Sequence, residues 1–261
     1  MAQEIIQVDA FSARPFAGNP AAVCIMDRPA ELAWMQSVAA EMNLSETAFL
    51  YPVDDGYNLR WFTPTVEVEL CGHATLASAH VLFSDNHCAR DKKIAFETKS
   101  GTLYACSDGD WITLDFPSRL SQPADPPEGL IKAIGAEPVA VLSAKPDYLI
   151  ELDSETTVRD LSPDHSALKA TGVRGLIVTA RGDGEYDFVS RFFAPGAGIE
   201  EDPVTGSAHC ILGPYWAKKL NKKKFTAFQA SKRGGVVKVL VKDDRCELSG
   251  QAVITLRGEL V

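Results

Sequence analysis

The chain has 261 residues, of which 46% are hydrophobic and 23% charged, and its formal net charge is −9 at pH 7. These proportions are typical of a globular protein and exclude a disordered or fibrous chain. The acidic balance argues against nucleic-acid binding, which needs concentrated Lys and Arg, and no apolar run approaches the ~18 residues of a membrane-spanning helix. The first residues have neither the basic nor the apolar region of a signal peptide, so we expect a cytoplasmic protein without membrane partners.

The cysteine content indicates a reduced protein without a disulfide framework. Six cysteines in a chain of this length are too few for a disulfide scaffold. They are Cys24, Cys71, Cys88, Cys106, Cys210 and Cys246. Together with the five histidines they show no metal-ligand spacing, and we expect no structural metal.

Strand-like runs dominate the first half, many of them alternating between apolar and polar residues. They cover residues 5–11, 21–26, 48–52, 57–62, 94–98, 102–105 and 112–116. Apolar residues at helical spacing predict one amphipathic helix from Leu32 to Asn43, and a second helix should start at Gly72 and continue through Phe83.

Turn formers fill residues 118–127, and we place a domain boundary there, giving domains 1–117 and 118–261. The second half repeats the plan, with a main helix from Gly206 through Trp216. Its predicted strands are residues 139–142, 148–152, 175–180, 188–193, 225–230, 236–241 and 252–257. The last of these could pair back with the first domain.

The helices after Gly72 and Gly206 are small and apolar on nearly every face, which is typical of buried helices. The sequence therefore predicts an α+β protein of two pseudo-symmetric domains. Each would be a mostly antiparallel, curved and barrel-like sheet wrapped around a central helix, with the active site in the cleft between the domains.

An internal repeat supports this division. RWFTP at 60–64 returns as RFFAP at 191–195, an offset of 191 − 60 = 131, and CGHA at 71–74 returns as TGSA at 205–208, an offset of 206 − 72 = 134. A duplicated unit is the simplest explanation. Differences between the two copies would then assign the chemical roles.

Each central helix is predicted to begin with Gly and a small polar residue, His73 in one copy and Ser207 in the other. Free N–H groups and the positive end of the helix dipole make such a start a binding site for an anion. Two facing helix starts would hold a small carboxylate. The alternative is that His73 and Ser207 only cap their helices.

Glu46 follows a predicted helix and enters an apolar strand, where partial desolvation would suit a general acid/base. An ordinary exposed loop glutamate is the alternative. At the offset of 131 its counterpart is Ile177, so the second copy offers no such carboxylate. Asp202 is either a turn former or a group at the rim of the site, and Cys71 is either a reactive thiol or a buried core residue.

Five segments resemble the PhzF-like isomerases of phenazine biosynthesis. They are residues 16–23, 43–47, 62–64 with 71–75, 202–209 and 250–253. The resemblance runs through essentially the whole chain and implies the fold of diaminopimelate epimerase. It also implies a cofactor-independent proton shuttle by a glutamate, aided by a histidine, an aspartate and a serine, roles that fall on Glu46, His73, Asp202 and Ser207. The epimerase uses two thiols, whereas this chain has Cys71 in one copy and Thr205 in the other.

We therefore expect an isomerase that moves a proton on a small carboxylic acid, with Asn19, Gly72, Thr205 and Gly206 contacting the substrate. Two alternatives stay open at this point: a one-thiol racemase or epimerase that uses Cys71, and a metabolite-binding protein without chemistry. Because family members often dimerise, the resemblance also makes a homodimer an expectation.

Overall fold

A computed structural model describes residues 3–261, which form two compact units. The first unit contains the chain up to Phe116 together with Ser249–Val261, and the second is the continuous stretch Pro117–Leu248. The sequence-based division differs in assigning the C-terminal segment to the second domain. Within residues 3–261, no helix is both long and apolar enough to cross a membrane.

The sheet of the first unit is mixed but mostly antiparallel. Its strands are β1 (Gln3–Ala10), β2 (Asn19–Ile25), β3 (Glu46–Val53), β4 (Gly56–Phe62), β5 (Glu67–Val68), β6 (Ile94–Thr98), β7 (Gly101–Asp108), β8 (Trp111–Pro117) and β18 (Ala252–Leu260). They pair in the order β18–β1–β2–β3–β4–β6–β7–β8, and β5 also pairs with β4. Only the β2–β3 and β4–β6 pairs are parallel. The C-terminal strand β18 thus joins the N-terminal strand β1 in one sheet.

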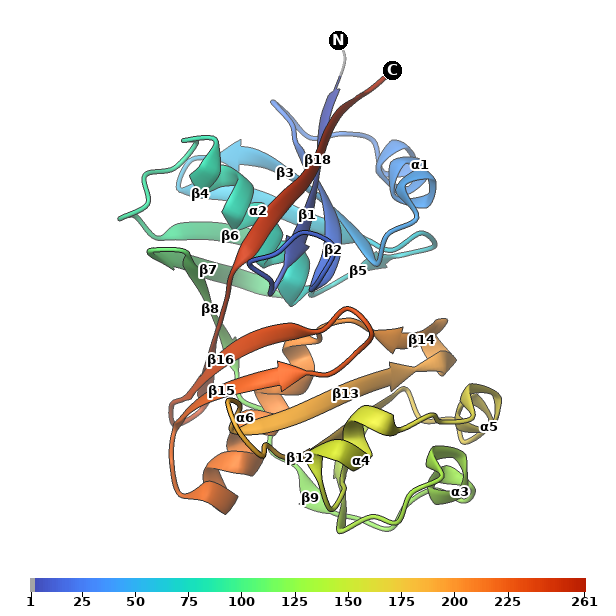
Figure 1. The fold of residues 1–261 in the computed structure, drawn as a ribbon. Helices are drawn as coiled ribbons and strands as arrows, with labels where there is room; N and C mark the ends of the chain where they lie inside the picture. Colours follow the sequence, from blue (N-terminus) through green and yellow to red (C-terminus); the bar gives the residue numbers. More distant parts are fainter. Residues whose placement is uncertain (1–2) are drawn as a thin grey trace. The chain divides into compact units, whose positions relative to one another are not determined.

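Helix α2 (Gly72–Ser84) is the central helix of this unit and packs against β1, β2, β3 and β18 (Figure 1). Ten of its thirteen residues are buried, which agrees with its apolar composition on every face. Helix α1 (Leu32–Met42) packs on β3 and β4 through a separate cluster that includes Met35, Phe49 and Phe62. The sheet is therefore covered by apolar contacts on both faces.

The second unit repeats this pairing pattern. Its strands are β9 (Gln122–Pro123), β10 (Ala140–Ala144), β11 (Asp147–Glu151), β12 (Gly175–Arg181), β13 (Phe188–Ala194), β14 (Ile199–Asp202), β15 (Lys224–Gln229), β16 (Gly235–Val241) and β17 (Arg245–Gly250). The order β10–β11–β12–β13–β15–β16, with β11–β12 and β13–β15 parallel, matches β1–β2–β3–β4–β6–β7 of the first unit. Every strand predicted from the sequence is present, whereas β5, β9, β14 and β17 were missed.

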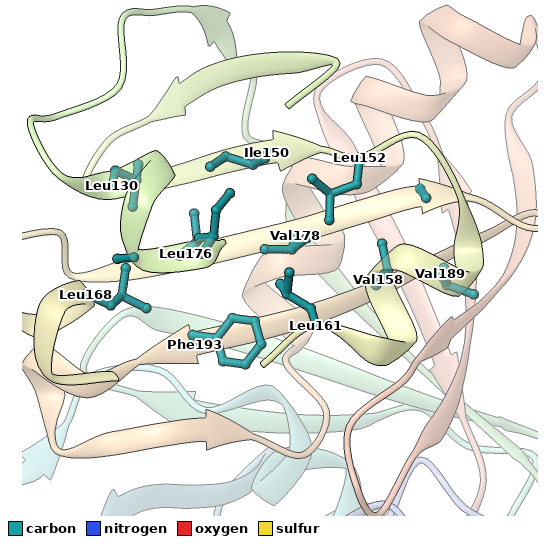
Figure 2. Packing of buried hydrophobic residues seen from close by; sticks show 13 residues of the cluster. Leu130, Ile150, Leu152, Val158, Leu161, Leu168, Leu176, Val178, Val189 and Phe193 are labelled. Carbon is teal, nitrogen blue, oxygen red and sulfur yellow. The ribbon is translucent and has the colours of Figure 1, made fainter. Parts of the chain in front are cut away.

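Three short helices cover the outer face of β11, β12 and β13: α3 (Leu130–Ile134), α4 (Glu155–Asp160) and α5 (His165–Ala170). Figure 2 shows Leu130, Val158 and Leu168 from these helices packed over Leu176 and Val178 of β12. Sequence analysis missed all three, because five or six residues are too few to show a helical period. Side-chain caps begin two of them: Ser154 accepts from the N–H of residue 157 and Asp164 from that of residue 167.

The central helix of the second unit is α6 (Gly206–Leu220), preceded by a short 3-10 turn at Pro195–Ala197. It packs against β16, and Trp216 donates from Nε1 to Thr179 of β12 at 3.1 Å. Along β12, Leu176 and Val178 face the short helices while Thr179 faces α6. Because both faces of this strand are covered, its sequence reads as a continuous apolar run.

Each unit has an Arg–Glu ion pair that joins the two strands preceding its central helix in the sequence, and we call each of these pairs a brace. Arg60 of β4 makes a bidentate pair with Glu67 of β5 at 2.8 and 2.9 Å, and Arg191 of β13 pairs with Glu201 of β14 at 2.7 and 3.0 Å. Each guanidinium also lies over a phenylalanine two residues on, at 5.3 and 4.9 Å from the ring centroid. Glutamates in the acidic stretches before the central helices therefore hold two hairpins together.

The strand register corrects the predicted counterpart of Glu46. β3 pairs Phe49 with Arg60, and β12 pairs Val178 with Arg191, so these strands are related by an offset of 178 − 49 = 129. Glu46 therefore corresponds to Gly175 and not to Ile177. A Cβ atom at Gly175 would lie 2.5 Å from the Phe192 ring and 2.7 Å from an Asp147 oxygen. The second unit has no room for a side chain at this position.

Candidate active site

Glu46 is the first residue of β3 in the first unit, where it pairs with Ala21 of the parallel strand β2. Helix α1 ends four residues earlier, and Asn43 closes it in the left-handed conformation, which turns the chain into the strand. The Glu46 side chain is 14% exposed. The predicted position of a partly desolvated carboxylate between a helix and an apolar strand is confirmed.

His73 is the second residue of α2, and its imidazole is buried. The N-cap residue is Cys71, whose thiol lies 3.5 Å from His73 Nδ1. The alternative in which His73 only caps the helix is therefore excluded. The helix places the ring at its start, where the N–H groups of the first turn have no carbonyl of the same helix to bond.

Asn19 begins β2 and is completely buried. Its Nδ2 atom lies 3.2 Å from His73 Nδ1. Gly18 before it adopts a positive φ of 67°, and a Cβ there would lie 2.1 Å from the Ala10 carbonyl oxygen, so only glycine fits this turn. Asp9 of β1 accepts from the Phe16 N–H at 2.6 Å and holds the same loop.

The polar cluster of the first unit is thus Asn19, Glu46, Cys71 and His73. His73 Nε2 lies 3.2 Å from Glu46 Oε2, but the pair does not have hydrogen-bond geometry, so this is a close polar contact rather than an aligned hydrogen bond. Burial lowers the pKa of His73 to about 3. The imidazole is therefore neutral at physiological pH, and the contact is not an ion pair.

Glu46, Cys71 and His73 also offer three metal-ligand atoms that lie within 4.8 Å of one another. The thiol faces Nδ1 of the ring, whereas the carboxylate faces Nε2. One ion would bind only one of the two ring nitrogens, while the thiol and the carboxylate each lie nearest to a different one. The arrangement fits a chain of polar contacts better than a metal centre.

The second unit carries its own polar cluster, around the loop from Asp202 to Gly206. Thr205 is the N-cap of α6, and its hydroxyl donates to Asp202 Oδ2. Its N–H donates to Gln229 Oε1 at 2.8 Å, and Gln229 Nε2 donates to the Asp202 carbonyl at 2.8 Å. Gln229 is fully buried at the end of β15 and was missed by sequence analysis, because nothing local in the sequence links it to residue 205.

Ser207 is the second residue of α6, at the same helix position as His73 in α2, and it is half-buried. The alternative in which Ser207 only caps its helix is excluded, since Thr205 is the N-cap residue. His209 lies one turn into the helix, with its Nδ1 atom 2.8 Å from the Thr205 carbonyl oxygen. Burial lowers the pKa of His209 to about 4. In the first unit the same carbonyl of the N-cap residue accepts from the Thr75 hydroxyl at 2.6 Å.

The predicted site residues therefore fall into two groups. Asn19, Glu46 and His73 come together in the first unit next to Gly72. The second group, in the second unit, comprises Asp202, Thr205, Gly206 and Ser207. The assembly of both groups into one site stays a prediction.

The family model described as phenazine biosynthesis-like protein, PhzC-PhzF, matches residues 8–258. The chain belongs to this family. The PhzF-family chain is 54% identical to an uncharacterized isomerase of Halalkalibacterium halodurans, over 100% of this chain and 99% of the relative. A crystal structure of a PhzF-family phenazine biosynthesis protein from Enterococcus faecalis is 42% identical and superposes with a TM-score of 0.96, covering 100% of both chains.

The fold extends beyond the PhzF family. A probable proline racemase from Agrobacterium radiobacter is 12% identical and has a TM-score of 0.69, with 99% of this chain and 93% of that chain covered. This likeness concerns the fold alone. The resemblance stated from the sequence motifs is confirmed, and so is the epimerase-like α+β class.

Proposed function

We propose that this PhzF-family isomerase transfers a proton between carbons of a small carboxylic acid, without a cofactor, and that Glu46 is the general acid/base. The observation that supports it is the pairing of a partly buried carboxylate with a buried, neutral imidazole 3.2 Å away. The Glu46 carboxylate removes a proton from one carbon, breaking a C–H bond while the electron pair shifts into the unsaturated system. The same carboxyl group then returns the proton to a second carbon, so the net reaction is an isomerisation.

His73 supports this chemistry as a neutral donor. An uncharged imidazole next to Glu46 does not form the tight ion pair that would weaken the carboxylate as a base. In the first unit, the substrate carboxylate is assigned to the start of α2, with the N–H group of Gly72 as a donor. The roles expected for Asp202 and Ser207 of the second unit stay predictions.

The one-thiol racemase is less well supported. A nucleophilic or basic thiol needs a neighbour that takes its proton, and the Cys71 thiol lies 3.5 Å from His73 Nδ1. Burial lowers the pKa of this imidazole, which disfavours a thiolate–imidazolium pair. Alkylation by iodoacetamide separates the two mechanisms, because turnover that survives modification of Cys71 excludes the thiol mechanism.

The test of the proposal is Glu46→Gln. A panel of small unsaturated and cyclic carboxylic acids is first searched by calorimetry for binding and then by NMR for incorporation of deuterium from D2O. Glu46→Gln should abolish deuterium incorporation and retain binding, because the amide keeps the shape and cannot carry the proton. Glu41→Gln, at an exposed position on α1 of the same unit, is the matched control and should exchange normally.

Exchange retained by Glu46→Gln would contradict the assignment of the base. Binding without exchange in the wild-type protein would instead favour the metabolite-binding protein. Independence from a metal is tested on the same reaction, since exchange should survive dialysis against EDTA. If EDTA abolished exchange and added Zn²⁺ restored it, the result would indicate a metal centre at Glu46, Cys71 and His73.

A further inference from the structure

One nitrogen of His73 is contacted from two sides. Its Nδ1 atom lies 3.2 Å from the Asn19 amide nitrogen and 3.5 Å from the Cys71 thiol. An amide NH2 group can only donate a hydrogen bond, and a thiol is a weak donor. The Asn19 contact therefore makes Nδ1 the bare, accepting nitrogen of a neutral ring, and the Cys71 thiol can donate to the same nitrogen.

The backbone fixes both contacts in place. Asn19 is completely buried and follows Gly18, where the close approach to the Ala10 carbonyl excludes any side chain. Cys71 is buried and extended at the N-cap of α2, two residues before His73 on the same helix start. The burial of both side chains and their places at the start of β2 and of α2 keep them next to Nδ1.

The consequence lies on the other side of the ring. With Nδ1 bare, the proton of a neutral imidazole is on Nε2, the atom 3.2 Å from Glu46 Oε2. The opposite tautomer would direct a nitrogen lone pair at an ionised oxygen, which is repulsive. Polar contacts at active sites often become aligned only when substrate binds, so the unaligned contact is that of a donor ready to close on Glu46.

We propose that Asn19 and Cys71 are positioning residues that hold His73 in the Nε2–H tautomer, so that the imidazole donates toward Glu46. They act through His73, and Asn19 thereby has a role besides the predicted substrate contact. The catalytic part of this inference rests on the proposed function of Glu46. The tautomer itself can be measured without any substrate.

The experiment uses the full chain labelled with ¹⁵N in histidine. Long-range ¹H–¹⁵N spectra distinguish a bare ring nitrogen from a protonated one, and the signals that His73→Gln removes are those of His73 among the five histidines. The wild-type protein should show a bare Nδ1 and a protonated Nε2 for His73. A protonated Nδ1 would overturn the proposal directly.

Asn19→Asp is the decisive variant, because it replaces the donor at Nδ1 by an acceptor of the same shape. It should reverse the tautomer and slow deuterium exchange at least about tenfold. Asn86→Asp, at an exposed left-handed position of the same unit, is the matched control and should leave the His73 signals unchanged. If Asn19→Asp fails to fold, the wild-type spectrum decides alone.

Cys71 is tested by two substitutions with opposite expectations. Cys71→Ser keeps a donor at Nδ1 and should preserve the tautomer, whereas Cys71→Ala should shift the tautomer ratio by about fivefold toward Nδ1–H. An unchanged tautomer in both Asn19→Asp and Cys71→Ala would overturn the positioning role. If the tautomer responds as expected but Glu46→Gln retains exchange, the proposed function fails and the positioning role remains.

Discussion

Both units bury an imidazole within the first turns of their central helix, His73 in one and His209 in the other. Desolvation lowers their pKa values to about 3 and about 4, from 6.5 for a free side chain. Between pH 6.5 and the folded values, the unfolded chain binds more protons than the folded chain. These histidines therefore stabilise the protein fully above pH 6.5, and this contribution is lost as the pH falls.

A pH-dependent loss of stability follows at the residue scale. Between pH 7 and pH 5 the free energy of unfolding should fall by about 2 kcal/mol through His209 alone, because each unit of pKa shift corresponds to about 1.4 kcal/mol. Urea unfolding at the two pH values measures it. His209→Gln should unfold with a flatter pH dependence, and an identical dependence in the variant and the wild type would contradict the prediction.

At the scale of secondary-structure elements, the Arg60–Glu67 and Arg191–Glu201 pairs have the same geometry and different surroundings. The side chain of Arg191 is 12% exposed and that of Arg60 is 27% exposed. Arg191 also donates to the Leu161 carbonyl at 2.5 Å, while Glu67, the partner of Arg60, keeps a second cation in Lys99 at 2.6 Å. Loss of Arg191 therefore removes the cation that pairs with Glu201, whereas after loss of Arg60 the Glu67 carboxylate still pairs with Lys99.

Arg191→Ala should lower the free energy of unfolding by about 3 kcal/mol, because the partly buried Glu201 carboxylate loses its arginine partner. Arg60→Ala should cost about 1 kcal/mol, because the Glu67 carboxylate is still paired with Lys99. Chemical denaturation of both variants tests the ranking. Equal losses would mean that the second cation does not reduce the cost of losing the arginine.

The glycine that replaces Glu46 in the second unit is set by packing. Gly175→Ala should destabilise the protein by about 1–3 kcal/mol, because the added methyl group overlaps the Phe192 ring and an Asp147 oxygen. Gly184→Ala, where a Cβ meets nothing within 4 Å, should stay within about 0.5 kcal/mol of the wild type. Thermal or urea unfolding measures the change, and an unchanged free energy of unfolding in Gly175→Ala would contradict the prediction.

At the scale of the whole molecule, the return of Ser249–Val261 makes the first unit discontinuous in sequence. β18 pairs with β1 from Ala10↔Ala252 to Gln3↔Leu260 and gives β1 a partner on the side opposite β2. Without β18, the long strand β1 would be an exposed edge, which favours aggregation. The second unit, in contrast, is a single stretch with its own apolar core.

Residues 117–248 expressed alone should therefore fold cooperatively, and residues 1–116 should not, unless residues 249–261 are joined to them. Circular dichroism and dispersed amide NMR spectra of the three fragments provide the measurement. A well-folded 1–116 fragment would show that β18 is dispensable. The expectation of a homodimer also belongs to this scale and stays a prediction, which sedimentation of the full chain would test.

Much of the architecture was readable from local patterns. Alternating residues predicted the strands, and helices that are apolar on every face predicted the burial of α2 and α6, because these signals depend on neighbours a few residues apart. The position of Glu46 at a helix-to-strand junction was equally local. The short helices α3, α4 and α5 were not, since their stability comes from packing on β12 and not from their own period.

By itself, the sequence determined the duplication, the two helix starts and the presence of one carboxylate, Glu46, without a duplicate. Only the tertiary structure decided that Gly175 is its counterpart, that Gln229 holds the loop before α6, and that Asn19, 54 residues from His73, contacts the same ring nitrogen as Cys71. The physical reason is strand register. A shift of two residues in pairing between distant strands leaves every local pattern intact and yet changes which side chains meet.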